Sequence, residues 1–121
     1  MLMYFGLYNF VIMIKTEDLP ECPAATTIEL VGSKWKLLIL RSLLQRPFRF
    51  SELKRALEGI SHKVLASSLH SMEEDGIISR RVYGTKPPKV EYSLTELGQT
   101  LRPLLSVMEE WGKFYKSQVN S

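Results

Sequence analysis

A basic and small polar set of side chains recurs at helical spacing in the middle of the chain: His62, Lys63, Ala66, Ser67 and His70. On a helix these residues would share one face. Imidazole, ammonium and hydroxyl groups form hydrogen bonds with base edges, and an alanine allows close approach to DNA or meets a thymine methyl group. The pattern therefore indicates contact with a polyanion, and a solvated helix face is the alternative.

Catalytic and metal chemistry have little support in the sequence. His62 and His70 are eight residues apart, which is too far along one helix to chelate one ion together, and no acid or cysteine completes a ligand set. The sequence contains neither a glycine-rich phosphate loop nor a nucleophile motif. We therefore expect a protein that is not an enzyme and that has no cofactor and no metal.

The polar set lies within Gly59 to Gly76, a segment that predicts one amphipathic helix. Ser61 stands where a side-chain oxygen caps a helix start, and Gly76 stands where a left-handed residue ends a helix. The apolar residues of the segment share the opposite side and are expected to face the core. They are Val64, Leu65, Leu69 and Met72.

Shorter helices are expected before this segment. Lys34 to Gln45 has an apolar stripe, and Pro23 suits the first turn of a short helix that reaches about Val31. Phe48 to Leu57 predicts a further helix with Ser51 as its cap. Two short helices joined by a tight turn that contains glycine are typical of a helix-turn-helix, whose second helix enters a major groove.

A hairpin is expected directly after the helix-turn-helix. Ile77 to Tyr83 and Val90 to Leu94 are rich in β-branched and aromatic residues, as strands are. The loop between them, Gly84 to Lys89, contains two prolines, two lysines and a glycine, so it predicts an extended basic tip. The expected fold is mainly α with a small β-hairpin wing, a winged helix-turn-helix.

The expected DNA contacts come from three places: the helix that begins near Ser61, the helix before it and the wing. The first would read base edges, and the other two would hold phosphates or the minor groove. The predicted set is Arg49, Ser51, Lys54, Ser61, His62, Lys63, Ala66, Ser67, His70, Arg80, Lys86 and Lys89.

The last helix is expected from Glu96 to about Ser117, capped by Thr95 and kinked at Pro103. Its apolar stripe is longer than a small domain needs. An intermolecular helix pair would bury the surplus, and the alternative is that the stripe covers the wing and the first helix. The expected dimer interface comprises Leu101, Leu104, Leu105, Met108, Trp111 and Tyr115.

Charge is distributed unevenly along the 121 residues. Residues 34–89 contain 12 Lys and Arg against 5 Asp and Glu, although the net charge of the whole chain is only +3. A basic middle between acidic flanks indicates a surface that binds a polyanion. The single cysteine, Cys22, excludes an intramolecular disulfide, so a reducing cytoplasm is the expected compartment.

The first fourteen residues are nearly all apolar. They are too few for a spanning helix, which needs roughly 20 residues, and they lack a basic n-region and a cleavage site. Three interpretations remain: an arm buried in a partner subunit, an interfacial membrane contact, or sequence upstream of a start at Met13. We favour the buried arm and expect no membrane partner. The expected organisation is an N-terminal arm over residues 1–21 and a winged domain over residues 22–118 with a C-terminal dimerisation helix.

Six ordered motifs resemble the HxlR-type family of bacterial winged helix-turn-helix regulators, relatives of the MarR group. The motifs are CP at 22–23, GSKWKLLIL at 32–40, RFSELKRAL at 49–57, GISHKVL at 59–65, LHSMEEDGIISR at 69–80 and PPKVEYSLTELG at 87–98. The resemblance implies a homodimeric transcription factor that binds double-stranded DNA at paired half-sites. It also implies that the helix over 61–75 is the recognition helix and that the loop over 84–89 is the wing. Two features depart from the family pattern: the apolar arm, and Lys86 where family members often have an acid.

The family includes regulators that sense oxidants or electrophiles through a cysteine near the position of Cys22. This cysteine precedes Pro23 at an expected helix start, near the positive end of the helix dipole. A redox switch is therefore one hypothesis, and an inert buried cysteine is the alternative; the sequence does not identify an effector. A second class of function is an adaptor that uses the winged fold to join an assembly without reading DNA.

Overall fold

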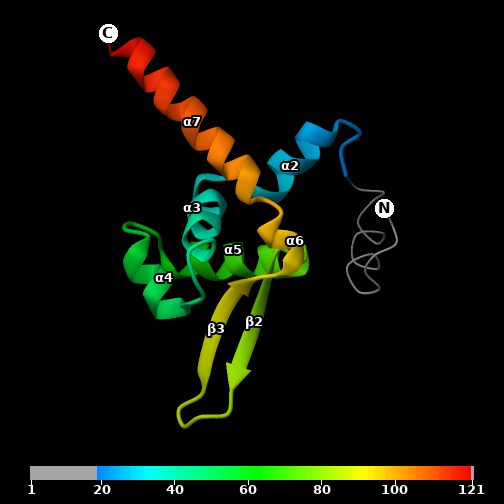
Figure 1. The fold of residues 1–121 in the computed structure, drawn as a ribbon. Coiled ribbons are helices and arrows are strands. Elements are labelled where there is room, and N and C mark those ends of the chain that lie inside the picture. The colour runs from blue at the N-terminus through cyan, green and yellow to red at the C-terminus, as the bar shows by residue number, and fades with distance from the viewer. Residues whose placement is uncertain (1–18, 121) are drawn as a thin grey trace.

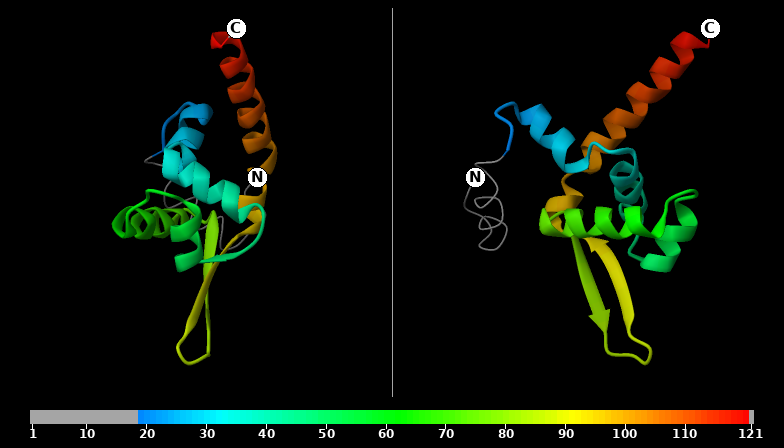
Figure 2. Two further views of the ribbon diagram at one scale, coloured as in Figure 1. Left: turned by 90° about the vertical axis from the view of Figure 1, so that its left-hand side faces the viewer. Right: turned by 180° about the vertical axis from the view of Figure 1, so that it is seen from behind.

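The computed structural model describes residues 19–120. Its elements are α2 (Pro23–Val31), α3 (Lys34–Leu43), β1 (Phe48–Arg49), α4 (Phe50–Ala56), α5 (His62–Glu74), β2 (Ile78–Tyr83), β3 (Lys89–Leu94), α6 (Glu96–Gln99) and α7 (Arg102–Val119). The helices α3, α4 and α5 form the body (Figure 1). The β2–β3 hairpin and α7 project from opposite ends of this body, as the two further views also show (Figure 2). The mainly helical winged fold expected from the sequence is confirmed; residues 1–18 of the expected arm lie outside the described residues.

The core lies where α3, α4, α5 and the start of β2 meet. Burial of apolar side chains from all four elements is the main stabilising term, at about 25 cal/mol for each Å² removed from water. The innermost side chains are at most 2% exposed. They are Ile39, Leu40, Leu53, Leu65, Leu69, Met72 and Ile78.

Three of the four expected core residues of α5 are buried, but Val64 is not. Leu65, Leu69 and Met72 are at most 1% exposed, whereas Val64 is 37% exposed. The expectation for Val64 is wrong because α5 begins at His62, so Val64 lies in its first turn, where the side chain stays exposed. Both ends of α5 follow the sequence signals. The Ser61 hydroxyl accepts a hydrogen bond from the Val64 backbone N–H at 3.1 Å, and Gly76 adopts a φ of 79°.

The short strand β1 was not expected from the sequence. Phe48 pairs with Tyr92 and Arg49 with Glu91, so β1 adds a third strand to the hairpin in the order β1-β3-β2. Because Phe48 is 7% exposed, its burial favours this extended pairing. Helix α4 then begins at Phe50 with Arg49 in the N-cap position, so Ser51 lies inside the helix and the expected Ser51 cap is wrong.

The expected C-terminal helix is divided into α6 and α7. Thr95 caps α6 as predicted, since its hydroxyl accepts from the Gly98 backbone N–H at 3.0 Å. A turn at Thr100 and Leu101 then separates the two helices. Pro103 lies in the first turn of α7, where a missing backbone donor costs no intrahelical hydrogen bond, so it starts a helix instead of kinking one.

Candidate nucleic-acid interface

The first turn of α5 is exposed on its outer side and meets α4 through Phe50, which lies against His62. Ser61, His62, Lys63 and Val64 are each exposed, and they lie between the buried residues Ile60 and Leu65. In a helix-turn-helix, the residues at the start of the second helix are those that contact base edges. The exposed first turn of α5 is therefore accessible for insertion into a groove.

The polar side chains of α5 differ in how free they are. Lys63 and Ala66 are exposed, and the part of the chain that the structure describes gives Lys63 no hydrogen bond or ion pair. The Ser61 oxygen serves as the helix cap, and the Ser67 hydroxyl donates to the Val64 carbonyl oxygen at 3.2 Å. Ser61 thus has a structural role in addition to the predicted one, whereas Lys63 is available to a ligand.

The two histidines of α5 lie in different surroundings. The His62 ring lies 4.7 Å from the Phe50 ring, measured between centroids, with the planes tilted by 48°. His70 Nε2 lies 3.4 Å from Glu74 Oε2, one turn further along the helix. Since Glu73 and Glu74 follow it, His70 stands where α5 becomes acidic, and the free basic character of α5 is concentrated in its first turn.

Helix α4 presents exposed basic side chains close to the start of α5. Arg49 at the N-cap of α4, Ser51 in its first turn and Lys54 in its last turn are exposed, and Phe50 brings the first turn of α4 against His62. The Glu52 carboxylate accepts from the Arg49 backbone N–H at 2.8 Å, and this hydrogen bond lowers the pKa of Glu52. Glu52 Oε1 also lies 3.4 Å from Arg46 Nη1, so the acid of α4 is occupied by neighbouring groups.

The cations of the wing also differ from one another. Arg80 and Lys86 are exposed, with Lys86 in the loop at the tip. Lys89 is half-buried because its ammonium lies 4.0 Å from Glu91 Oε2 and 5.0 Å from the centre of the Tyr83 ring. Arg81 is an exposed cation that the sequence prediction missed; its position beside Tyr83 becomes visible only from the strand register.

The contacts that connect these three elements include one between aromatic rings and one between strands. Phe50 joins α4 to His62 of α5, and the register of β1 places Arg49 opposite Glu91 of the wing. The predicted contacts at the start of α4 and the start of α5 are therefore neighbours. Lys86 at the tip and His70 near the end of α5 lie away from this junction.

The predicted dimer residues of α7 change from buried to exposed along the helix. Leu105 is 9% exposed and Leu101 and Leu104 are half-buried, whereas Met108, Trp111 and Tyr115 are exposed. The Trp111 and Tyr115 rings stack with centroids 5.5 Å apart. The same open surface includes apolar residues that were not predicted, namely Val107, Phe114 and Val119.

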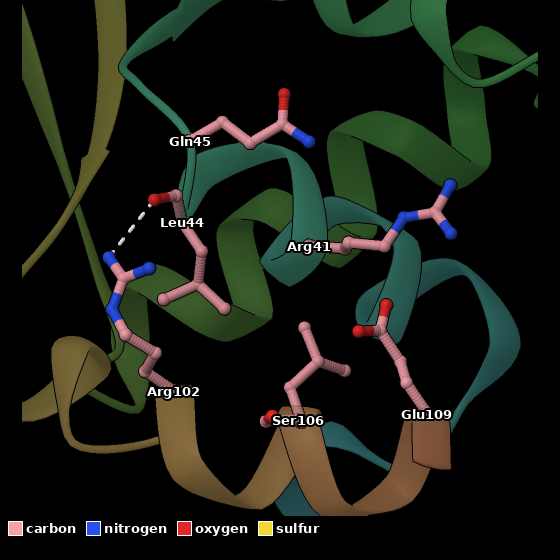
Figure 3. Close-up of a pocket in the computed structure, with 7 residues that line it drawn as sticks. Arg41, Leu44, Gln45, Arg102, Ser106 and Glu109 are labelled. Atoms are coloured by element: carbon pink, nitrogen blue, oxygen red, sulfur yellow. Dashed lines mark hydrogen bonds between the residues drawn. The ribbon is translucent and has the colours of Figure 1, made fainter.

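Two pockets border the base of α7. One, of about 310 Å³, has an apolar lining that includes Ile28 and Val31 of α2 and Leu104 and Met108 of α7. The other, of about 450 Å³, lies between the end of α3 and the start of α7. In it, Arg102 reaches back to the Leu44 carbonyl oxygen at 3.0 Å, and Arg41 points to the other side (Figure 3). Since the two guanidinium groups diverge, this pocket is not a convergent anion site.

Residues 19–120 form neither a metal-binding cluster nor a helix suited to crossing a membrane. In this range no group of three His, Cys, Asp or Glu side chains is arranged to hold a metal ion. None of the helices described is both long enough and apolar enough to cross a bilayer. Cys22 is exposed at the N-cap position of α2.

The helix pair α4–α5, followed by the β2–β3 hairpin, defines a winged helix-turn-helix protein. The chain belongs to the HxlR-like helix-turn-helix family, whose model matches residues 30–120. Among its relatives, the uncharacterized HTH-type transcriptional regulator YdeP of Bacillus subtilis is 41% identical over 105 residues, which are 87% of this chain and 82% of YdeP.

Solved structures of similar proteins agree with this assignment. The redox regulator HypR in its reduced form superposes with a TM-score of 0.78 at 38% identity, over 82% of this chain and 98% of HypR. The reduced transcriptional regulator YodB of B. subtilis superposes with a TM-score of 0.68 at 35% identity, over 76% and 91% of the two chains. The family predicted from the sequence motifs is thereby confirmed.

Proposed function

We propose that the protein is a homodimeric regulator of transcription that inserts the first turn of α5 into a major groove and sets the wing on the DNA backbone or in the minor groove. The observation that carries the proposal is the exposed turn from Ser61 to Val64, which starts beside Phe50 in the first turn of α4, next to the exposed cation Arg49. Membership of a family of helix-turn-helix regulators supports duplex DNA as the partner.

Charge and contact geometry support distinct roles for the two ends of α5. Lys63 and His62 at the start meet base edges, and Ala66 and Ser67 continue this face for one more turn. His70 lies beside Glu74, so it contributes at the margin of the interface. Arg49, Ser51 and Lys54 hold phosphates beside α4, and Arg80, Lys86 and Lys89 do so at the wing.

Homodimerisation through α7 follows from the exposed apolar side chains on that helix. Trp111 and Tyr115 form a stacked pair on open surface, and Met108 continues it toward the base of the helix. A contiguous apolar surface of this kind marks a protein interface. A two-fold dimer also matches paired half-sites about 34 Å apart on DNA.

Regulation through Cys22 is a further part of the proposal. The thiol is exposed and stands at a helix start, and the similar structure HypR is described as a redox regulator. Oxidation of two Cys22 thiols, one from each protomer, to a disulfide transfers two electrons to an oxidant such as a peroxide or diamide and releases both thiol protons. Such a bond would change the position of the DNA-binding elements of one protomer, α4, α5 and the wing, relative to those of the other.

The test is titration of fluorescent duplex DNA from the protein's own promoter region at several salt concentrations. We expect binding whose affinity falls steeply as salt rises, with a slope that reports the number of phosphates contacted. A duplex of the same length and composition but scrambled sequence serves as the control and should bind more weakly. Absence of binding at low salt would instead support the adaptor function. A footprint on the same DNA gives the half-site spacing.

A further inference from the structure

Four side chains form a cluster on one face of the wing hairpin. The strand register places Arg81 opposite Glu91 and Tyr83 opposite Lys89. Directly opposed residues of an antiparallel pair project from the same face, and successive residues along a strand alternate between faces. Arg81, Tyr83, Lys89 and Glu91 therefore share one face, whereas Arg80 belongs to the other.

Tyr83 contacts each of the other three members of this cluster. The Arg81 guanidinium carbon lies 5.2 Å and the Lys89 ammonium nitrogen 5.0 Å from the centre of the Tyr83 ring, within the range of a cation–π contact. The Tyr83 hydroxyl donates a hydrogen bond to Glu91 Oε1 at 3.0 Å. One aromatic side chain thus holds two cations and an acid in fixed positions.

These contacts reduce the conformational entropy that the side chains of this face would lose on binding DNA. Long basic side chains lose rotamer freedom when they are fixed on a phosphate, and contact with an aromatic ring imposes part of that loss before the DNA arrives. The Glu91 carboxylate lies on the same face, and its second oxygen is 4.0 Å from the Lys89 ammonium, so the charge of Lys89 offsets the repulsion between Glu91 and phosphates.

We propose that Tyr83 is a positioning residue of the wing, which holds Arg81 and Lys89 side by side so that both reach DNA phosphates. The inference rests on the proposed DNA binding and deepens it in two respects. It adds Arg81 to the set of phosphate contacts, and it assigns the half-buried Lys89 a fixed position. Arg81 is exposed, so a phosphate can reach it without rearrangement of the strands.

The experiment measures the affinity of the full chain for its promoter duplex, and the slope of that affinity against salt, for Tyr83→Val and Tyr83→Phe. Valine suits a strand but removes the ring. For Tyr83→Val we expect affinity to fall about threefold to tenfold and the salt slope to decrease by about one to two phosphate contacts. Tyr83→Phe keeps the ring and should stay within about twofold of the wild type.

A thermodynamic cycle separates positioning from other roles. In an Arg81→Gln/Lys89→Gln background, Tyr83→Val should cause no further loss of affinity, because the cations through which Tyr83 acts are gone. Val82→Ala is the matched control. Val82 is 54% exposed on the other face of the same strand, so its truncation should change neither affinity nor slope.

The outcomes distinguish this inference from the proposed function. If the wild type shows no salt-sensitive binding, DNA binding itself is wrong. If the wild type binds but Tyr83→Val matches it in affinity and slope, the positioning role is wrong. Further loss in the double-variant background, or equal losses for Phe and Val, also overturns it. Circular dichroism and thermal unfolding check the hairpin; if Tyr83→Val is unfolded at the assay temperature, Tyr83→Thr is measured against the same criteria.

Discussion

The Phe50 and His62 rings lie against each other, 4.7 Å apart between centroids, at the point where α4 meets the start of α5. Phe50 is half-buried and packs on the core, whereas His62 is exposed. A fixed ring therefore supports the first side chain of the proposed recognition helix. Because this support limits the orientations of the imidazole, it bears on sequence preference more than on overall affinity.

We predict that Phe50→Leu weakens binding to the promoter duplex about threefold and leaves the affinity for a scrambled duplex unchanged. Leucine keeps an apolar side chain in the core but removes the contact between aromatic rings. Such a contact contributes about 0.5–1.5 kcal/mol. Phe50→Tyr keeps the ring and serves as the control. Fluorescence titration with the two duplexes measures the effect. Equal losses on both would show that Phe50 acts only through stability.

Truncation of Lys63 and truncation of Lys86 are predicted to change DNA binding in different ways. Lys86→Ala at the wing tip should weaken binding to all sequences alike and reduce the salt slope by about one contact. Lys63→Ala in the open turn of α5 should also change which base pairs are preferred. Binding to a panel of single-site operator variants measures both. An unchanged salt slope for Lys86→Ala would contradict the assignment of the wing.

Truncation of Trp111 should separate the protomers. Trp111 is 62% exposed and stacks on Tyr115, so in the proposed dimer its burial supplies much of the interface energy. We expect Trp111→Ala to raise the dissociation constant of the dimer by at least about tenfold, as measured by analytical ultracentrifugation. Lys113→Ala, on the polar side of α7, is the matched control. A wild type that sediments as a monomer at micromolar concentration would overturn the dimer.

In the Cys22→Ser variant, an oxidant should no longer release the protein from DNA. Binding to DNA under reducing conditions should be unchanged. The serine hydroxyl is close in size to the thiol and cannot form a disulfide. Binding to the promoter duplex is measured before and after treatment with diamide, and non-reducing electrophoresis checks for a cross-linked pair. If the Cys22→Ser protein is still released in full, another group is the sensor.

Gly98→Ala is predicted to destabilise the fold. A Cβ atom at Gly98 would lie 2.2 Å from the Ile77 carbonyl oxygen, and a backbone atom cannot move aside as a flexible side chain does. We expect a loss of about 1–3 kcal/mol in the free energy of unfolding, measured by urea denaturation. Gly84→Ala is the control, since nothing lies within 4 Å of its Cβ position and its stability should be unchanged.

Local signals predicted most of the fold. The caps at Ser61 and Thr95 and the left-handed Gly76 act within a few residues of the chain, so the printed sequence contains all that determines them. The errors occurred where distant segments decide. Phe48 and Arg49 become extended because they pair with β3, more than 40 residues later, and Ser51 loses its cap position as a consequence.

The candidate site was predictable in composition but less so in detail. Lys63 and Lys86 are exposed as a charge pattern suggests. The burial of Lys89 and the position of Arg81 depend on which residues face one another across the hairpin, which a one-residue shift in register would reverse. Val64 has the spacing of a core residue, but only the packing around α5 shows that its side chain is exposed.

The two-residue turn at Thr100 and Leu101, which separates α6 from α7, fixes the helical phase of the proposed dimer. Each residue of a helix advances by about 100°, so one residue inserted between this turn and Trp111 would swing the apolar stripe of α7 about a quarter turn around its axis. An insertion of seven residues would return the stripe to within about 20° of its original direction. The number of residues between the turn and Trp111 therefore determines how the DNA-binding elements of one protomer of the proposed dimer are rotated relative to those of the other. This effect is independent of every side chain that touches DNA.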